Sequence, residues 1–90
     1  MLILKDYVEA ARNNIENRSK ILYDYGLKLK EMGWIENMME GCFISPDFST
    51  CFVYNRSPYY GELQQYNRDN EAFLKIKSQL EKDFIELYIV

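Results

Sequence analysis

The side chains that most often carry chemistry are sparse in this chain of 90 residues, which has no histidine and only two cysteines. Histidine is the commonest general base and a common zinc ligand, so its absence excludes catalytic triads of the Ser-His-Asp and Cys-His kinds. The four glycines are isolated, and none opens a phosphate-binding loop ahead of a helix. We therefore expect a protein that is not an enzyme and that holds no cofactor or metal.

The two cysteines, Cys42 and Cys51, are too few for a metal site without histidine, and their spacing matches no zinc or redox motif. One interpretation is that both are small apolar side chains buried in a reducing compartment. The other is a cross-strand disulfide, which requires the two residues to be neighbours in a hairpin. The sequence is consistent with both interpretations.

The strongest functional signal lies between Tyr54 and Tyr60, where three tyrosines and an arginine fall in a segment that reads as a loop. Tyrosine and arginine often dominate the binding energy of protein interfaces, because the ring and the guanidinium are rigid groups that bury a large area. The alternative is that the tyrosines line the core. The candidate partner-binding residues are Arg56, Tyr59 and Tyr60, joined by Phe52 and Tyr54 if the aromatic face of the neighbouring hairpin is uncovered.

These residues must be positioned by the elements around them, and the first of these is a long helix. Apolar or aromatic residues recur three and four apart from Leu4 to Met32, with Arg18 in the one vacant position. This spacing predicts a helix with one apolar face. We expect the helix over residues 7–32, with the unbroken form favoured over a break near Asn13-Asn14 or Asn17-Arg18-Ser19.

Both ends of this helix have local signals. Asp6 followed by Glu9 resembles a capping box at the start. Gly33 can take the left-handed conformation just past the end, and Trp34 would then fold back on Leu29, as in a Schellman motif. Arg18, inside the apolar stripe, should either extend its guanidinium to water or meet a carboxylate.

The middle of the chain predicts a β-hairpin. Residues 41–54 are rich in aromatic and β-compatible side chains on either side of Pro46-Asp47. If these two are the central turn residues, the register follows from the turn. It sets Cys42 opposite Cys51, Phe43 opposite Thr50 and Ile44 opposite Ser49.

Alternation along the hairpin gives it two apolar faces. One face carries the smaller side chains and the other the aromatic ones, so either could become the core. Residues 34–39 and 59–65 could add a strand on each side, making a meander. The smaller face consists of Cys42, Ile44, Cys51 and Val53, and the aromatic face of Phe43, Phe52 and Tyr54.

A second helix is predicted over residues 70–87, because apolar residues from Phe73 to Leu87 again share one helical face. The order of elements predicts an α+β fold, with a long N-terminal helix, a central antiparallel hairpin or short meander, and a C-terminal helix. Residues 1–90 are expected to form one domain, because a chain this short supports a single core.

The charge pattern disfavours direct nucleic-acid binding. The net charge is −3, and 14 acidic residues are interspersed with 11 basic ones, so no broad basic surface is expected. The longest apolar runs are far shorter than the roughly 20 residues of a membrane span. The N-terminus has no signal-peptide pattern, so the cytoplasm is the default location.

From these features we expect a non-enzymatic protein–protein interaction module, a small regulator or inhibitor that occupies another protein's surface. Immunity proteins and anti-defence proteins encoded by mobile elements are consistent classes. One alternative is a homodimeric structural or adaptor protein that pairs through the first helix. The other is an accessory nucleic-acid-binding module, whose basic residues would have to converge on one helix face.

Overall fold

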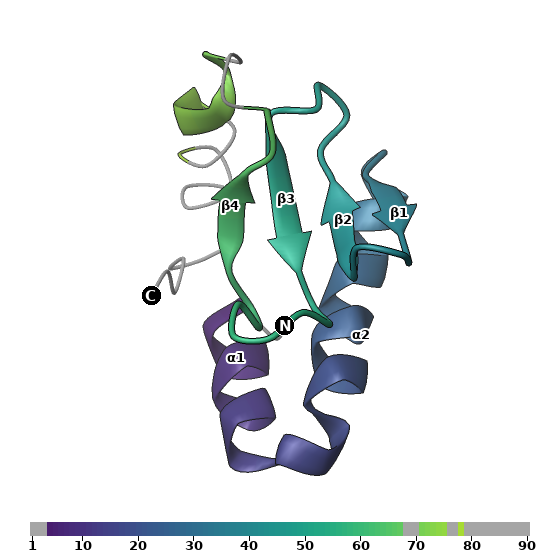
Figure 1. Ribbon diagram of the computed structural model, residues 1–90, viewed down its shortest axis with the longest axis vertical. Helices are drawn as coiled ribbons and strands as arrows, with labels where there is room; N and C mark the ends of the chain where they lie inside the picture. Colours follow the sequence, from purple (N-terminus) through teal and green to yellow (C-terminus); the bar gives the residue numbers. More distant parts are fainter. Residues whose placement is uncertain (1–3, 68–70, 76–77, 79–90) are drawn as a thin grey trace.

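The computed structural model describes residues 4–67, 71–75 and 78. Its α+β architecture has a four-stranded antiparallel sheet with two helices packed on one face (Figure 1). No helix among these residues is long and apolar enough to cross a membrane. The elements, in chain order, are helix α1 (Leu4–Asn13), the 3-10 turn η1 (Ile15–Asn17), helix α2 (Arg18–Glu31) and strands β1 (Ile35–Asn37), β2 (Cys42–Ile44), β3 (Thr50–Val53) and β4 (Leu63–Gln65).

The apolar stripe of the N-terminal segment forms two helices, so the unbroken helix favoured from the sequence does not form. Asn14 has φ −139° and ψ 78°, outside the helical region, and η1 follows it before α2 begins. Asparagine side chains compete for backbone hydrogen bonds, which makes the Asn13-Asn14 pair a weak point in a long helix. The break turns the chain back, so that α1 and α2 lie side by side (Figure 1).

The predicted end of this helical segment is confirmed, whereas the predicted start is too late. Asp6 lies in the first turn of α1, which already includes Leu4, so Asp6 complements the helix dipole and does not mark the first residue. Gly33 has φ 101°, and the Trp34 N–H donates to the Leu29 carbonyl at 3.1 Å. Trp34 is buried in the same cluster as Leu29, as expected for a Schellman motif.

The sheet is a meander in the order β1-β2-β3-β4, so the central hairpin and both flanking strands are present. The predicted register between β2 and β3 is wrong by two residues. The observed pairs are Cys42 with Val53, Phe43 with Phe52 and Ile44 with Cys51, in place of Cys42 with Cys51, Phe43 with Thr50 and Ile44 with Ser49.

The loop between β2 and β3 explains this shift. The Ser45 N–H donates to the Thr50 carbonyl at 2.8 Å, so residues 46–49 together form the loop. Inside it, Asp47 Oδ1 accepts hydrogen bonds from Ser45 Oγ at 2.8 Å, from Ser49 Oγ at 2.7 Å and from the Ser49 N–H at 3.0 Å. A two-residue turn would pair Ser49 with a strand residue, and the Asp47 carboxylate could not then cap both arms of the loop.

We predict that this loop makes stability depend on acid through Asp47. Burial raises the pKa of Asp47, but the hydrogen bonds from Ser49 and Ser45 outweigh it, so the pKa lies below its usual value. Because the folded pKa is the lower one, the contribution is complete above the unfolded pKa of about 3.9 and is lost as pH falls through the folded pKa. At neutral pH, Asp47→Asn should lower the free energy of unfolding by about 0.5–1 kcal/mol, since Asp47 itself is exposed.

The measurement is urea unfolding of the wild type and of Asp47→Asn at pH 7 and at pH 3. Asparagine keeps an acceptor oxygen at the same position and cannot titrate, so the difference between the two proteins isolates the carboxylate. That difference should shrink at pH 3. A difference that is the same at both pH values would contradict the assignment.

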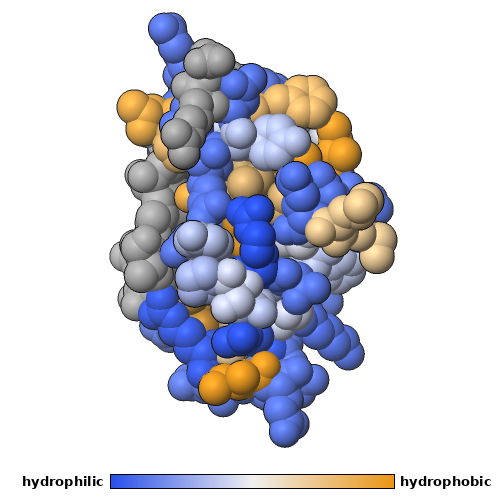
Figure 2. All heavy atoms as spheres, viewed as in Figure 1, coloured by the Kyte–Doolittle hydropathy of each residue, from blue (hydrophilic) through white to orange (hydrophobic). Residues whose placement is uncertain are grey.

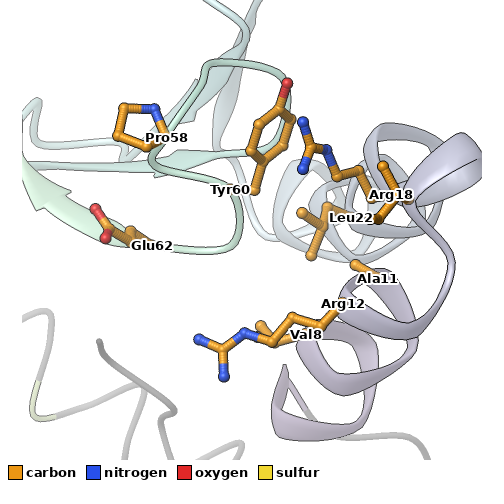
Figure 3. Close-up of a pocket in the computed structure, with 9 residues that line it drawn as sticks. Val8, Ala11, Arg12, Arg18, Leu22, Pro58, Tyr60 and Glu62 are labelled. Atoms are coloured by element: carbon orange, nitrogen blue, oxygen red, sulfur yellow. The ribbon is translucent and has the colours of Figure 1, made fainter.

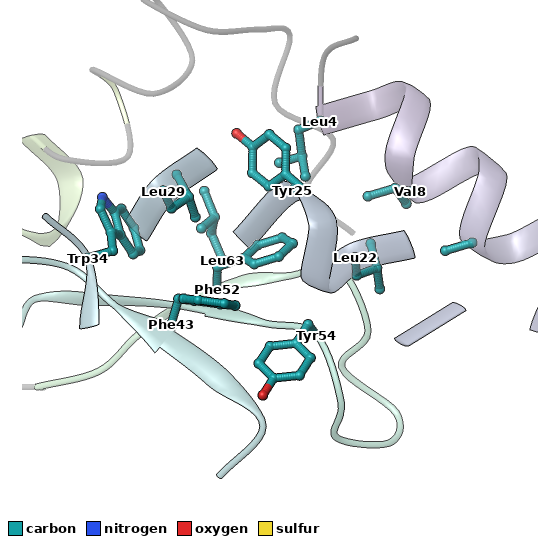
Figure 4. Close-up of a cluster of buried hydrophobic side chains, with 11 residues drawn as sticks. Leu4, Val8, Leu22, Tyr25, Leu29, Trp34, Phe43, Phe52, Tyr54 and Leu63 are labelled. Atoms are coloured by element: carbon teal, nitrogen blue, oxygen red, sulfur yellow. The ribbon is translucent and has the colours of Figure 1, made fainter. Parts of the chain in front are cut away.

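A shift of two residues preserves the alternation of side chains, so the two predicted faces of the hairpin are retained. The aromatic face is covered by the helices and forms the main core (Figure 4). The smaller face is buried as a second, separate cluster made of Cys42, Ile44, Cys51 and Val53. The main core gathers Phe43, Phe52, Tyr54 and Leu63 from the sheet side and Leu4, Val8, Ala11, Leu22, Tyr25, Leu29 and Trp34 from the helical segment.

The predicted C-terminal helix over residues 70–87 lies largely outside the described residues. Within them, residues 73–75 and 78 are helical.

Candidate interaction surface

The structure separates the five predicted partner-binding residues into two groups, and the first belongs to the core. Phe52 is fully buried and Tyr54 is 7% exposed. The Tyr54 ring centroid lies 5.1 Å from that of Tyr23 and 5.2 Å from that of Phe43. The helices cover the aromatic face, so the condition for adding Phe52 and Tyr54 to the surface is not met.

The second group, Arg56, Tyr59 and Tyr60, lies on the loop between β3 and β4. Tyr59 is 41% exposed, whereas Arg56 and Tyr60 are half-buried. Internal hydrogen bonds shape the loop, including one from the Tyr59 N–H to the Arg56 carbonyl at 2.8 Å. Ser19 Oγ donates to Asn55 Oδ1 at 2.9 Å and ties the start of the loop to α2. These side chains are therefore presented by an ordered loop.

Arg18, the first residue of α2, joins this group through Tyr60. Its guanidinium carbon lies 3.7 Å from the centroid of the Tyr60 ring, which is the geometry of a cation–π contact. From the sequence we expect the Arg18 guanidinium to reach water or a carboxylate, and the aromatic partner was not predicted. Its position in the apolar stripe was the only local signal, because Tyr60 is distant in the sequence.

Arg56 is held by a hydrogen bond to Gln64, a residue of β4. Its Nη2 donates to Gln64 Oε1 at 3.0 Å, and Gln64 Nε2 donates in turn to Glu62 Oε2 at 2.8 Å. The guanidinium carbon lies 5.6 Å from the Tyr59 ring centroid. Its Nε is buried without a hydrogen bond to the described part of the chain. Arg56 and Tyr59 are therefore a second arginine–tyrosine pair on the same loop.

A pocket of about 260 Å³ opens next to the Arg18–Tyr60 pair (Figure 3). Val8, Ala11 and Leu22 are core residues that form its apolar side, and Pro58 and Tyr60 close it from the loop. Ile15, at the turn between the two helices, lines the pocket while 69% of it is exposed. The charged lining residues are Arg12, Arg18 and Glu62.

We call Ile15, Arg18, Arg56, Tyr59 and Tyr60 the Arg–Tyr surface. In the view of Figure 2, apolar side chains stand in separate groups near the top, right and bottom of the molecule, with polar atoms between them. Exposed apolar area is therefore not continuous across that view.

A pocket that combines an apolar wall with guanidinium groups is suited to binding, because it can take an apolar side chain and an anion together.

In the described residues, no three cysteine, aspartate or glutamate side chains gather in a way that would hold a metal ion. Comparison of the chain with protein-family models, with curated proteins and with solved structures found no match in any of the three.

Proposed function

We propose that this protein is a non-enzymatic protein–protein interaction module, a small regulator or inhibitor that occupies a partner's surface with the Arg–Tyr surface. Immunity and anti-defence proteins are classes of regulator that this proposal includes, and it keeps the cytoplasmic location expected from the sequence. The observation that carries it is the stacked Arg18–Tyr60 pair at the edge of an apolar pocket, beside exposed Tyr59.

The contact with the Tyr60 ring orders the Arg18 side chain before a partner binds. Stacking restrains a long side chain before the partner arrives, so less conformational entropy is lost when the complex forms. A guanidinium that lies flat on a ring still presents its N–H groups in its own plane, where they can bind a carboxylate in bidentate fashion. Arg18 thus supports recognition of an acidic side chain next to the pocket.

The pocket also favours one orientation of the partner. Val8 and Leu22 offer apolar contact, so an aliphatic or aromatic side chain is the matching occupant. Glu62 would repel a carboxylate on the loop side, whereas Arg18 attracts one on the helix side. We therefore infer a partner segment in which an apolar side chain enters the pocket and a neighbouring acidic side chain points toward Arg18.

The two alternative functions receive less support. The apolar stripe that suggested pairing through the first helix is largely buried in the core, where it includes Val8, Leu22 and Leu29. It is therefore not available to pair with a second copy of the chain. The basic residues that a nucleic-acid-binding face would need are dispersed. Lys30 pairs with Glu36 at 3.4 Å, and Lys28 lies near the ring of Tyr7 at the opposite end of α2 from Arg18.

Site-specific photo-crosslinking tests the proposal. Tyr59 is replaced by p-benzoylphenylalanine, and the same residue is placed at Phe48 as a control. Phe48 is matched in exposure, at 49% against 41%, but lies in the loop at the other end of the sheet (Figure 1). Irradiation in an extract of the native host should give a covalent adduct with one other protein from position 59 and not from position 48.

The alternatives give different products. An adduct of twice the chain mass from position 59 would support the homodimer. Equal adducts from both positions, or none from position 59, would contradict binding through the Arg–Tyr surface.

A further inference from the structure

The turn between α1 and α2 interrupts an apolar stripe that continues on both sides of it. Ala11 before the turn and Leu22 after it would lie on one face of a straight helix, because the eleven residues between these positions make about three turns. The backbone leaves the helical region mainly at Asn14, with φ −139° and ψ 78°. Asn17 is close to that region at φ −111° and ψ 11°, and Arg18 is helical. A change centred on Asn14 would therefore straighten the segment into a single helix.

The turn is weakly held by its own side chains. Neither Asn14 nor Asn17 caps the helix that follows it, and the hydrogen bond between their two side chains is long, at 3.5 Å. Ile15, a member of the apolar stripe, is 69% exposed. In a straight helix Ile15 would return to the apolar face, where a second apolar surface can cover it. The closed turn therefore leaves both the caps and the burial of Ile15 incomplete.

If the segment straightens, α1 is the part that moves, because α2 is tied to the sheet. Ser19 Oγ donates to Asn55 Oδ1 at 2.9 Å, and the Arg18 guanidinium lies on the Tyr60 ring, so the start of α2 is attached to the β3–β4 loop. A straight helix over residues 4–31 would be about 42 Å long, which exceeds the 35 Å longest dimension of the fold. In that form α1 leaves the core of its own chain.

The place that α1 leaves is complementary to another copy of α1. Leu4, Val8 and Ala11 are each less than 5% exposed in the main core, so an empty site there would uncover Leu22 and leave a large cavity. We propose that two copies of this chain exchange α1, with each helical segment straight at the Asn14 hinge and with α1 of one copy packed on α2 and in the core of the other. Such a dimer keeps the contacts that α1 makes in the single chain, so the second copy is the occupant that fits.

This dimer differs from one in which two closed chains pair through the first helix. In the closed chain the stripe is buried and has no free face, whereas in the exchanged dimer it stays buried through the same contacts, now made with the second copy. The pocket of the Arg–Tyr surface is then shared between copies, because Val8 and Ala11 line it from α1 and Tyr60 lines it from the loop. The exchange itself is independent of the proposed partner binding.

The test compares Asn14→Ala with Asn14→Gly, a matched pair that removes the same exposed side chain. Each chain is refolded from urea at low and at high concentration, because α1 must leave the core to exchange. Light scattering after gel filtration then gives the masses of the products. Alanine favours a helix and glycine disfavours it, and two hinges change in each dimer. The dimerisation constant should therefore be at least about tenfold higher for Asn14→Ala, with the wild type between.

A photo-crosslinker at position 7 shows which chain α1 packs on. Tyr7 is half-buried, and its ring lies 5.4 Å from the Tyr25 ring and 5.5 Å from Lys28 Nζ, so p-benzoylphenylalanine in its place reacts with α2. In the isolated dimer the adduct should have twice the chain mass, and in the isolated monomer it should be internal. The crosslink and the hinge comparison are separate readouts, so one decides the outcome if a variant used for the other fails to fold.

Chains that stay monomeric at every concentration would overturn the proposal. Equal dimerisation constants for the two hinge variants would do the same, and so would a dimer whose adduct from position 7 is internal, since its copies would associate without exchange. The purified chain is used alone, so these outcomes are separate from the capture of another protein by the Arg–Tyr surface.

Discussion

Gly26→Ala is expected to lower the free energy of unfolding by about 3 kcal/mol, because it would place a methyl group inside an occupied part of the core. Gly26 lies in α2 where the helix crosses β2, and a Cβ built there would overlap the ring of Phe43. Phe43 is fully buried, and its ring packs against Tyr23 and Tyr54 at centroid distances of 5.5 and 5.2 Å. The ring therefore cannot move aside without disturbing its neighbours.

The sign of this effect makes it diagnostic. In an exposed helix interior, replacing glycine by alanine usually stabilises the helix by about 1 kcal/mol. Urea unfolding of Gly26→Ala measures the change, and Phe43→Leu in the same chain should recover part of the loss by removing the ring. If Gly26→Ala alone were as stable as the wild type, α2 could not pack on β2 as described.

The helical segment shows what spacing can predict and what it cannot. The three-and-four spacing predicts which residues are buried, and Gly33 followed by Trp34 predicts the cap, because both depend on neighbouring residues. The close contact of Gly26 with the Phe43 ring could not be predicted from the sequence. An isolated glycine in a helical pattern does not indicate whether an aromatic ring packs against it. The break at Asn14 was visible only as a weak point in an otherwise continuous pattern.

The hairpin illustrates a different limit. Alternation has a period of two, so it predicts the faces of β2 and β3 but cannot distinguish registers that differ by two residues. The loop decides between them, through hydrogen bonds that Asp47 makes to Ser45 and Ser49. Those bonds depend on the three-dimensional path of the loop, which the Pro46-Asp47 dipeptide alone did not indicate.

The candidate surface was partly predictable. Composition marked the loop that carries Arg56, Tyr59 and Tyr60, because these residue types are enriched at interfaces. It could not separate exposed Tyr59 from buried Tyr54, which depends on where the helices pack. The pocket needs α1, η1, α2 and the β3–β4 loop to come together, so no local pattern could have predicted it.

Tyr54 and Tyr59 make a matched pair for the second large effect. Tyr54→Ala should lower the free energy of unfolding by about 3 kcal/mol, since it removes a buried ring that contacts two others. The fraction that stays folded should keep its affinity for the partner. Tyr59→Ala should change stability less, because Tyr59 is 41% exposed, and should weaken binding at least about tenfold if Tyr59 is an anchor. The two effects are separated by measuring, for each variant, the melting temperature and the affinity for the partner identified by crosslinking.

The most direct test of the central claim is the dissociation constant of the partner identified by crosslinking, measured for Tyr59→Ala and for Phe48→Ala. The two side chains are comparably exposed, but only Tyr59 belongs to the Arg–Tyr surface. We predict a dissociation constant at least about tenfold higher for Tyr59→Ala, equivalent to about 1.4 kcal/mol, with an unchanged melting temperature and with wild-type binding by Phe48→Ala. Equal dissociation constants for the two variants, or a loss in Tyr59→Ala that follows its unfolded fraction, would contradict the claim that this surface binds a protein partner.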